Sequence, residues 1–376
     1  MSIILDPAIR ILPEDHHIFV LHPGTNKRFY ADFEESKSVF LDIPAINLDI
    51  EPEEDTENLR NQLRMSKKIS MWHRAGAALD DEPSRNPDDY AVNNPSPAAP
   101  KLFHAINDLY SLARSGDLIL VPGKGYNSTV LIGEIEGDFD PNFKVESTRY
   151  PGEYIPARRV KWLPTSMAKG QFNRRLIKLM QNRQAIIKIT NEDDRREVYK
   201  VVYGDYVWND TSGNLIRVTK DEIDLNDLNK AVDLTNYFAC QYLALKDGKL
   251  KEFLSLPFND AIDAFYDKKY FGGVNVEIHS PGYFGRPMKL AMMAGYVSAM
   301  LALSGANVSA QEAQNVSVVN SANHVESICD KELEADLRES MEMYASLHLW
   351  KDVVCARREA TKKTVGLQTQ VTVKKK

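Results

Sequence analysis

Two apolar runs separated by a glycine-containing loop constrain the fold of this chain more than any other feature. Residues 117–122 (DLILVP) and 129–136 (TVLIGEIE) are rich in Leu, Ile and Val, and the loop GKGYNS lies between them. Short β-branched runs bounded by glycine and proline are typical of strands joined by a hairpin. We therefore expect a β-hairpin here and an N-terminal half built around a sheet.

The hairpin loop carries the residue types of a phosphate-binding loop, but not their order. That motif requires G-x-x-x-x-G-K-[S/T] between a strand and a helix. Here Lys124 precedes Gly125, no hydroxyl residue follows the lysine directly, and a strand follows the loop. Because no helix N-terminus points at a ligand, the electrostatic basis of the motif is missing. We do not expect nucleotide hydrolysis.

Composition bounds the class of protein. The 376 residues suggest two domains, and a net charge of -6 argues against a wholly basic nucleic-acid coat. The three cysteines (Cys240, Cys329 and Cys355) form no CxxC pair, which fits a reducing cytoplasm. The N-terminus has no signal-peptide pattern. Residues 290–311 are uncharged and long enough for a membrane span, but their Ala, Gly and Ser content favours a buried helix, so membrane association is not expected.

A block of positive charge lies within this acidic chain. Residues 154–191 contain nine Lys and Arg residues and no Asp or Glu, with Tyr154, Trp162 and Phe172 interleaved. A block of one sign beside aromatic residues suits a polyanion, with cations on phosphate and rings available for stacking. The alternative is that acidic residues 49–57 pair with this block inside the fold.

The coarse secondary structure differs between the two halves. Before residue 190 we expect short strands in 16–50, at 158–163 and at 185–190, and helices at 56–68, 101–114 and 171–183. Residues 196–220 suggest a hairpin that turns at Ser212 and Gly213. After that come helices at 221–247, 256–268, 286–304, 309–326 and 331–361, interrupted by one strand at 273–282. An apolar stripe at 333–354 predicts either core packing or self-association.

The order of motifs in the first half resembles the PUA/EVE-like module at the N-terminus of Mrr-type restriction proteins and related bacterial defence proteins. The resemblance covers about residues 10–190 and rests on three segments: Gly116 to Pro122, Gly133 to Phe139 (GEIEGDF), and Arg158 to Trp162 (RRVKW). It implies a small β-barrel that holds a base in a pocket with aromatic walls. It also implies a sensor without catalytic residues, acting in bacterial antiphage defence.

The expected architecture is therefore α+β. A PUA/EVE-like barrel with flanking helices occupies residues 1–190, a mostly helical assembly or effector domain with a short hairpin occupies 191–362, and a basic flexible tail occupies 363–376. We expect the first domain to bind DNA, RNA or a nucleotide, with DNA preferred. The partners expected beside this ligand are a second defence protein and further copies of the chain.

The predicted binding residues combine the basic block with the hairpin tip. Arg158, Arg159, Lys161, Arg174 and Arg175 are expected to hold phosphates. Trp162 and Tyr126 are expected to flank a base, with Lys124 beside Tyr126 at the mouth of the pocket. No catalytic residue, metal ligand or cofactor is predicted. His16, His17 and His22 are close in sequence, but no carboxylate or cysteine completes a metal set, so we expect surface histidines at a strand end.

Two other classes of function remain open. A divergent magnesium-dependent nuclease would use Asp205, Asp210 or Glu277, although the Gln-x-Lys strand of such nucleases is missing. A protein adaptor would use the basic block to bind an acidic partner. The nuclease class comes from the resemblance, because restriction proteins of this type carry a metal nuclease domain, whereas the adaptor class does not.

Overall fold

The computed structural model divides the chain into two compact units, one of residues 15–195 and one of residues 1–14 with 196–376. It describes residues 3–49, 57–78, 81–91, 100–165, 167–182, 184–273, 275–277, 282–306, 308–323 and 327–375. Helix accounts for 47% and strand for 19% of the protein, which places it in the expected α+β class.

Residues 15–195 contain a curled six-strand half-barrel sheet. Its strands follow the order β11, β3, β5, β6, β9, β4, and β10 pairs with β6. Their bounds are β3 (Ile18–Leu21), β4 (Ser38–Val39), β5 (Leu118–Pro122), β6 (Thr129–Ile135), β9 (Arg158–Trp162), β10 (Met167–Ala168) and β11 (Ile186–Lys188). A separate pair joins β7 (Lys144–Glu146) to β8 (Tyr154–Pro156).

The hairpin expected at 117–136 is confirmed as the centre of this sheet. Strands β5 and β6 pair antiparallel, with Leu118 opposite Glu134 and Pro122 opposite Val130. Strand β3 pairs parallel to β5 on the other side. Every residue of β3 and β5 is buried, as expected for strands that are covered on both faces.

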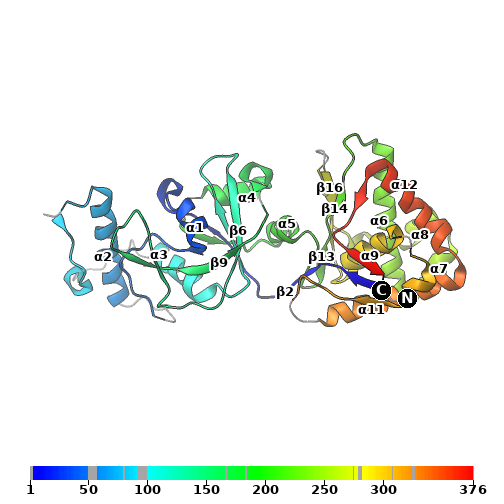
Figure 1. Cartoon of the computed structure of the whole chain (residues 1–376), viewed down its shortest axis with the longest axis horizontal. Coiled ribbons are helices and arrows are strands. Elements are labelled where there is room, and N and C mark those ends of the chain that lie inside the picture. The colour runs from blue at the N-terminus through cyan, green and yellow to red at the C-terminus, as the bar shows by residue number, and fades with distance from the viewer. Residues whose placement is uncertain are drawn as a thin grey trace. The chain divides into compact units, whose positions relative to one another are not determined.

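Residues 15–195 also contain helices. They are α1 (Tyr30–Ser36), α2 (Glu57–Arg74), α3 (Pro100–Ile106), which continues as a π-helical turn at Asn107–Leu112, and α4 (Arg174–Gln181). Shorter 3₁₀ turns occur at Thr25–Lys27, Pro87–Tyr90 and Lys169–Gln171. Several of these elements, including α1, α4, β6 and β9, are labelled in Figure 1.

The strands expected in 16–50 are only partly correct. Strand β3 forms, but α1 occupies much of the following apolar segment and leaves only the two-residue strand β4. The aromatic residues Phe29, Phe33 and Phe40 are all buried. Their rings contact edge to face across the helix and the chain that follows it, with Phe29 and Phe33 both against Phe40. Tertiary packing therefore overrides the local strand propensity.

The second unit is mostly helical. Its helices are α6 (Leu225–Lys246), α7 (Leu250–Ser255), α8 (Phe258–Phe265), α9 (Met293–Gly305), α10 (Ala310–Ala313), α11 (Ile328–Leu347), a π-helical turn at Trp350–Cys355 and α12 (Ala356–Val365). Helix α5 (Glu192–Tyr203) contains the point at which the two units divide. Helix α6 packs against both α8 and α9 (Figure 1).

The buried helix favoured by the composition of 290–311 forms as α9, over Met293–Gly305. In α9, residues such as Met293, Tyr296 and Leu301 are fully buried. A side chain at Gly295 would lie 2.4 Å from Ile9, so the small residue allows close packing. Within the described parts of the chain, no helix is both long and apolar enough to cross a membrane.

Three small sheets complete this unit. One has the order β18-β1-β20, one β17-β13-β12-β2 and one β15-β16-β14-β19. The bounds are β1 (Ile3–Asp6), β2 (Arg10–Leu12), β12 (Tyr206–Trp208), β13 (Thr211–Gly213), β14 (Ile216–Val218), β15 (Asn275–Glu277), β16 (Gly282–Gly285), β17 (Pro287–Met288), β18 (Val316–Val318), β19 (Leu367–Gln368) and β20 (Thr372–Lys375).

Both ends of the chain differ from expectation. Residues 1–14 do not belong with the first domain, because β1 pairs with β18 and β20, and β2 pairs with β12. Residues 363–376 were expected to be a flexible tail. They instead contain strands β19 and β20, with Val365 and Leu367 buried.

The hairpin expected at 196–220 is shorter and shifted. Residues 196–203 belong to helix α5, and the turn between β12 and β13 lies at Asn209 and Asp210 rather than at Ser212 and Gly213. Asn209 adopts a positive φ of 53°, which asparagine tolerates better than most residues. The apolar stripe of 333–354 is used for core packing, because Leu333, Leu337 and Met341 are fully buried.

Candidate functional site

The loop after β3 folds back, so that Lys27 lies beside His22, just past the end of β3. Gly24 and Lys27 have φ values of 68° and 60°, which fold the loop tightly. A side chain at Gly24 would lie 2.7 Å from the Phe29 ring. The amide of Lys27 donates to the Gly24 carbonyl at 3.1 Å, and the Lys27 amine donates to Nδ1 of His22.

The tip of the β5–β6 hairpin is held against the turn at 169–171. The Lys169 amide donates to the Ser128 carbonyl and the Gly170 amide to the Tyr126 carbonyl, both at 2.9 Å. A side chain at Gly170 would lie 2.3 Å from the Tyr126 ring. The Lys169 amine donates to the Gly123 carbonyl at 3.3 Å. The hairpin tip and this turn are therefore one packed element.

These two elements meet around a cavity of about 720 Å³. Three lysines reach it from separate segments: Lys27 from the loop after β3, Lys124 from the hairpin tip and Lys169 from the turn. We call this the lysine cavity. Its other walls are His22, Gly24, Thr25, Asn26, Leu41, Asp42, Met180, Gln181, Asn182 and Ala185. A volume of this size is within the range of small-ligand sites.

Burial and mutual repulsion perturb the charged groups of the lysine cavity. Burial and the charge of Lys169 lower the pKa of Lys27 to about 8. Burial also lowers the pKa of Lys169. Burial and the charge of Lys27 lower the pKa of His22 to about 4, so its ring is neutral at pH 7 and can accept from Lys27.

Asp42, the carboxylate that lines the lysine cavity, is already bound by other side chains. Both oxygens of Asp42 accept from Nη2 of Arg28, at 2.5 and 2.6 Å, and Oδ2 also accepts from Arg74 at 2.9 Å. The hydroxyl of Tyr150 donates to Oδ1 at 2.5 Å. In the described ranges, no carboxylate lies within ion-pair distance of Lys27, Lys124 or Lys169.

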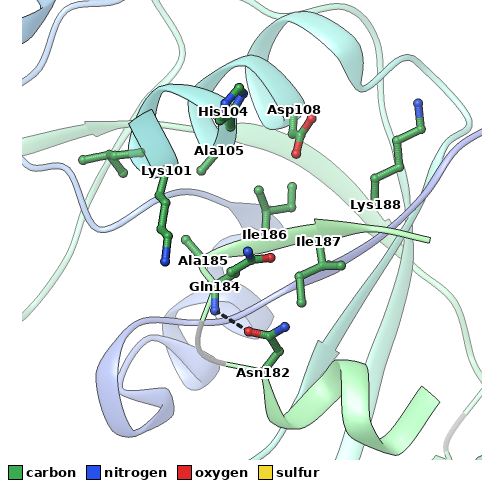
Figure 2. Close-up of a pocket in the computed structure, with 11 residues that line it drawn as sticks. Lys101, His104, Ala105, Asp108, Asn182, Gln184, Ala185, Ile186, Ile187 and Lys188 are labelled. Carbon is green, nitrogen blue, oxygen red and sulfur yellow. Dashed lines mark hydrogen bonds between the residues drawn. The ribbon is translucent and has the colours of Figure 1, made fainter. Parts of the chain in front are cut away.

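A second cavity of about 730 Å³ adjoins the first, and Asn182 and Ala185 line both. Figure 2 shows its walls: Lys101, His104 and Asp108 come from α3 and the π-helical turn, and Ile186 to Lys188 from β11. Burial raises the pKa of Asp108, and nearby cations, Lys188 first, oppose that rise. The Gln184 amide donates to Asn182 Oδ1 at 3.1 Å (Figure 2). This cavity carries both signs of charge.

Of the residues predicted to touch a ligand, Arg158 is buried and Trp162 is partly buried. Arg158 is 2% exposed and donates to the carbonyls of Leu109, Ala113 and Gly137 at 2.8–3.1 Å. It fastens the end of the π-helical turn, whose last carbonyls need donors. The indole of Trp162 donates to the Phe33 carbonyl of α1 at 3.1 Å. Both corrections follow from strand alternation, which turns these two side chains inward.

The other predicted cations are exposed, but they do not line the lysine cavity. Arg159 and Lys161 alternate with Arg158 and face outward, and the Arg159 guanidinium lies 3.8 Å from the centre of the Phe143 ring. Arg174 and Arg175 are exposed in the first turn of α4, and Arg175 lies 3.5 Å from Asp194. Of the eight predicted residues, only Lys124 lines the cavity, and Tyr126 packs beside it.

The sequence did not indicate Lys27 as a binding residue, assigned His22 only to a group of surface histidines, and included Lys169 only in the basic block. The signal for Lys27 was its position shortly after a Pro-Gly turn, which does not reveal where the amine points. His16 is buried and contacts the Gly116 carbonyl at 3.0 Å, so the expected group of surface histidines does not form. Of the acidic residues 49–57, proposed as an internal partner of the basic block, residues 50–56 lie outside the described residues.

The described carboxylates among those considered for a nuclease, Asp205 and Asp210, have different surroundings. Asp205 is fully buried and accepts from the Leu215 amide at 2.9 Å, whereas Asp210 is exposed in the β12–β13 turn. The side chain of Glu277 is not among those described. Over the described ranges, no three His, Cys, Asp or Glu side chains come together as a metal site.

Neither a protein-family model, nor a curated protein, nor a solved structure matches this chain.

Proposed function

We propose that residues 15–195 form a PUA/EVE-like module that binds a phosphate-bearing ligand, either nucleic acid or a nucleotide, and that the protein is a non-catalytic sensor of that ligand. The lysine cavity is the proposed binding site. Outside the cavity, exposed cations such as Arg159, Lys161 and Arg174 would attract a longer polyanion electrostatically.

The placement of the three family-like segments supports the first part of this proposal. Gly116 to Pro122 ends in β5, Gly133 to Phe139 begins in β6, and Arg158 to Trp162 is β9. These strands are consecutive neighbours in one curled sheet. Segments that are separate in sequence therefore form a single structural unit, as a barrel module requires.

The observation that carries the proposal is the unmatched charge of the lysine cavity. Two of its amines have lowered pKa values because they are desolvated, which is unfavourable for the isolated protein. An anionic ligand would reverse this cost by supplying charge-assisted hydrogen bonds. Perturbed groups that line a cavity are a physical signature of a binding site.

The biological setting is the part of the proposal that comes from the resemblance. A PUA/EVE-like sensor of the Mrr-related kind would act in the bacterial cytoplasm in antiphage defence. The helical unit would then signal to a second defence protein or assemble copies of the chain. The stripe at 333–354 does not supply that interface, because its central residues lie in the core.

A binding assay with matched variants tests the site. Fluorescence anisotropy would follow single-stranded DNA, double-stranded DNA and RNA oligonucleotides labelled at the 3′ end, with nucleoside monophosphates as competitors. The double variant Lys27→Gln, Lys124→Gln should weaken binding by about tenfold or more, as expected for two lost charge-assisted contacts. Lys178→Gln is the control, since Lys178 is exposed on α4 and lines neither cavity.

Two results would contradict the proposal. One is a wild-type protein that binds none of these ligands at low salt, where electrostatic binding is strongest. The other is a double variant that folds and binds as tightly as Lys178→Gln.

A further inference from the structure

We infer that the lysine cavity is a subsite for a terminal phosphate, the monoester group of a free nucleotide or of a nucleic-acid end, and not for an internal phosphodiester. The inference rests on the proposed function and narrows its ligand. It begins from the number and the origin of the amines around the cavity.

The three lysines approach from three independent segments. Lys27 belongs to the loop after β3, Lys124 to the hairpin tip and Lys169 to the turn that precedes α4. Cations along a phosphodiester backbone are usually spaced along a groove, one contact for each of several phosphates. Here they line one partly open cavity from three separate segments, so they favour a compact group that accepts hydrogen bonds from more than one of them.

The charge of the cavity matches a dianion. An internal phosphodiester carries one negative charge, whereas a phosphate monoester carries about -1.5 to -2 at pH 7 and offers three acceptor oxygens. The Asp42 carboxylate does not offset the lysines, because Arg28 and Arg74 already bind it. Three lysines therefore line the cavity for a group with three oxygens.

Lys27 is held in place for such a ligand. Its backbone is fixed by the tight loop from Gly24, and its amine rests on the neutral His22 ring. A neutral imidazole accepts a hydrogen bond without supplying the negative charge that a carboxylate would. The amine therefore keeps its charge available for the ligand.

The part of the ligand attached to the phosphate can extend into the second cavity, which adjoins the lysine cavity. The lysine cavity shares Asn182 and Ala185 with the second cavity, whose walls include aliphatic Ile186 and the polar side chain of Gln184 (Figure 2). A nucleoside attached to the phosphate would meet both apolar and hydrogen-bonding groups there. This adjacency fits a phosphate at the end of the ligand rather than one in the middle of a chain.

Binding of a dianion at this position should be coupled to the uptake of a proton by Lys27. The pKa of Lys27 is about 8 in the free protein, so part of the Lys27 population is neutral at pH 8 and above. A bound phosphate raises that pKa, and the complex takes up a proton. Affinity for the monoester should therefore fall as pH rises from 7 to 9.

The test is calorimetric titration of the full-length protein with two decanucleotides that differ only in a 5′-phosphate or a 5′-hydroxyl end. The phosphorylated strand should bind at least about tenfold more tightly. That preference should fall towards unity in Lys27→Gln and persist in Lys178→Gln. Titration with a nucleoside 5′-monophosphate and with the parent nucleoside should give the same order. Circular dichroism would establish that each variant is folded.

The outcomes separate this inference from the proposed function. Equal affinity for the two decanucleotides would overturn the terminal-phosphate subsite while nucleic-acid binding survives. A preference that persists unchanged in a folded Lys27→Gln variant would overturn the assignment of the subsite to this cavity. Binding of neither decanucleotide and neither small ligand would overturn both.

Discussion

Arg158 and Arg159 are adjacent in sequence and opposite in role. Strand alternation turns Arg158 into the half-barrel, where three carbonyls accept from it, and turns Arg159 to the surface. A basic pair read from sequence alone suggests two equivalent phosphate contacts. The structure instead assigns one of them to stability.

Substitution of this pair by glutamine separates the two roles. Arg158→Gln leaves buried carbonyls without their donor, and we expect the free energy of unfolding to fall by about 3 kcal/mol. Arg159→Gln should change it by about 0.5 kcal/mol or less, as for most exposed sites. Urea denaturation of both variants measures the difference. Equal stabilities would contradict the internal role of Arg158.

Asp205 predicts a pH dependence of stability. Burial raises its pKa to about 6 from the ordinary value of 3.8, so between these values the folded protein holds a proton that the unfolded chain has released. Rising pH therefore lowers the free energy of unfolding across that window, by about 3 kcal/mol in full. The loss is complete above about pH 7.

Asp205→Asn removes this titration. The asparagine carbonyl can still accept from the Leu215 amide, which Asp205 does at 2.9 Å. We expect the variant to be more stable than the wild type at pH 7.5 and about equal to it at pH 4. Urea midpoints at the two pH values measure this, and a variant less stable at pH 7.5 would argue for an ionised Asp205 with a partner.

At the scale of elements, the sequence predicts the helices and strands that are determined by the spacing of apolar residues and by glycine or proline at their ends. In three segments the apolar pattern fits a single type of secondary structure: the β5–β6 hairpin, the helix from 101 and the buried helix in 290–311. Helix α1 and the β12–β13 turn were missed because packing of aromatic rings and one residue with positive φ decided them. Neither the ring packing nor the positive φ can be recognised from the local sequence pattern.

The C-terminal strand gives a test at this scale. Strand β20 pairs with β1, from Lys375 opposite Ile3 to Thr372 opposite Asp6. Deleting residues 372–376 should therefore lower the free energy of unfolding by about 2 kcal/mol, a typical cost for a lost packed element. The flexible tail expected from the sequence would instead allow deletion without effect. Thermal and urea denaturation distinguish the two.

For the whole molecule, the two units define where the chain can be divided. The strands of the curled sheet all lie within 15–195, whereas the other unit needs residues 1–14 for β1 and β2. The boundary near residue 195 lies close to the one predicted at 190, but the place of residues 1–14 could not be predicted, because pairing between strands more than 300 residues apart in sequence has no local signal. The lysine cavity was missed for the same reason, since its cations come from three distant segments.

Fragments test this division. A fragment of residues 15–195 should fold cooperatively, since its sheet is complete. A fragment of residues 196–376 should be less stable than the same fragment mixed with a peptide of residues 1–14, which restores two strands. Circular dichroism melting curves would measure both, and identical melting of 196–376 with and without the peptide would contradict the assignment.

The lysine cavity as a phosphate site is the central claim, and nuclear magnetic resonance of ¹³C-methylated lysines tests it most directly. In the free protein, the Lys27 signal, assigned by its loss in Lys27→Gln, should titrate near pH 8. Addition of the 5′-phosphorylated decanucleotide should raise that pKa and shift the Lys124 and Lys169 signals, while Lys178 stays unchanged. A ligand that binds without moving the pKa of Lys27 would contradict the account.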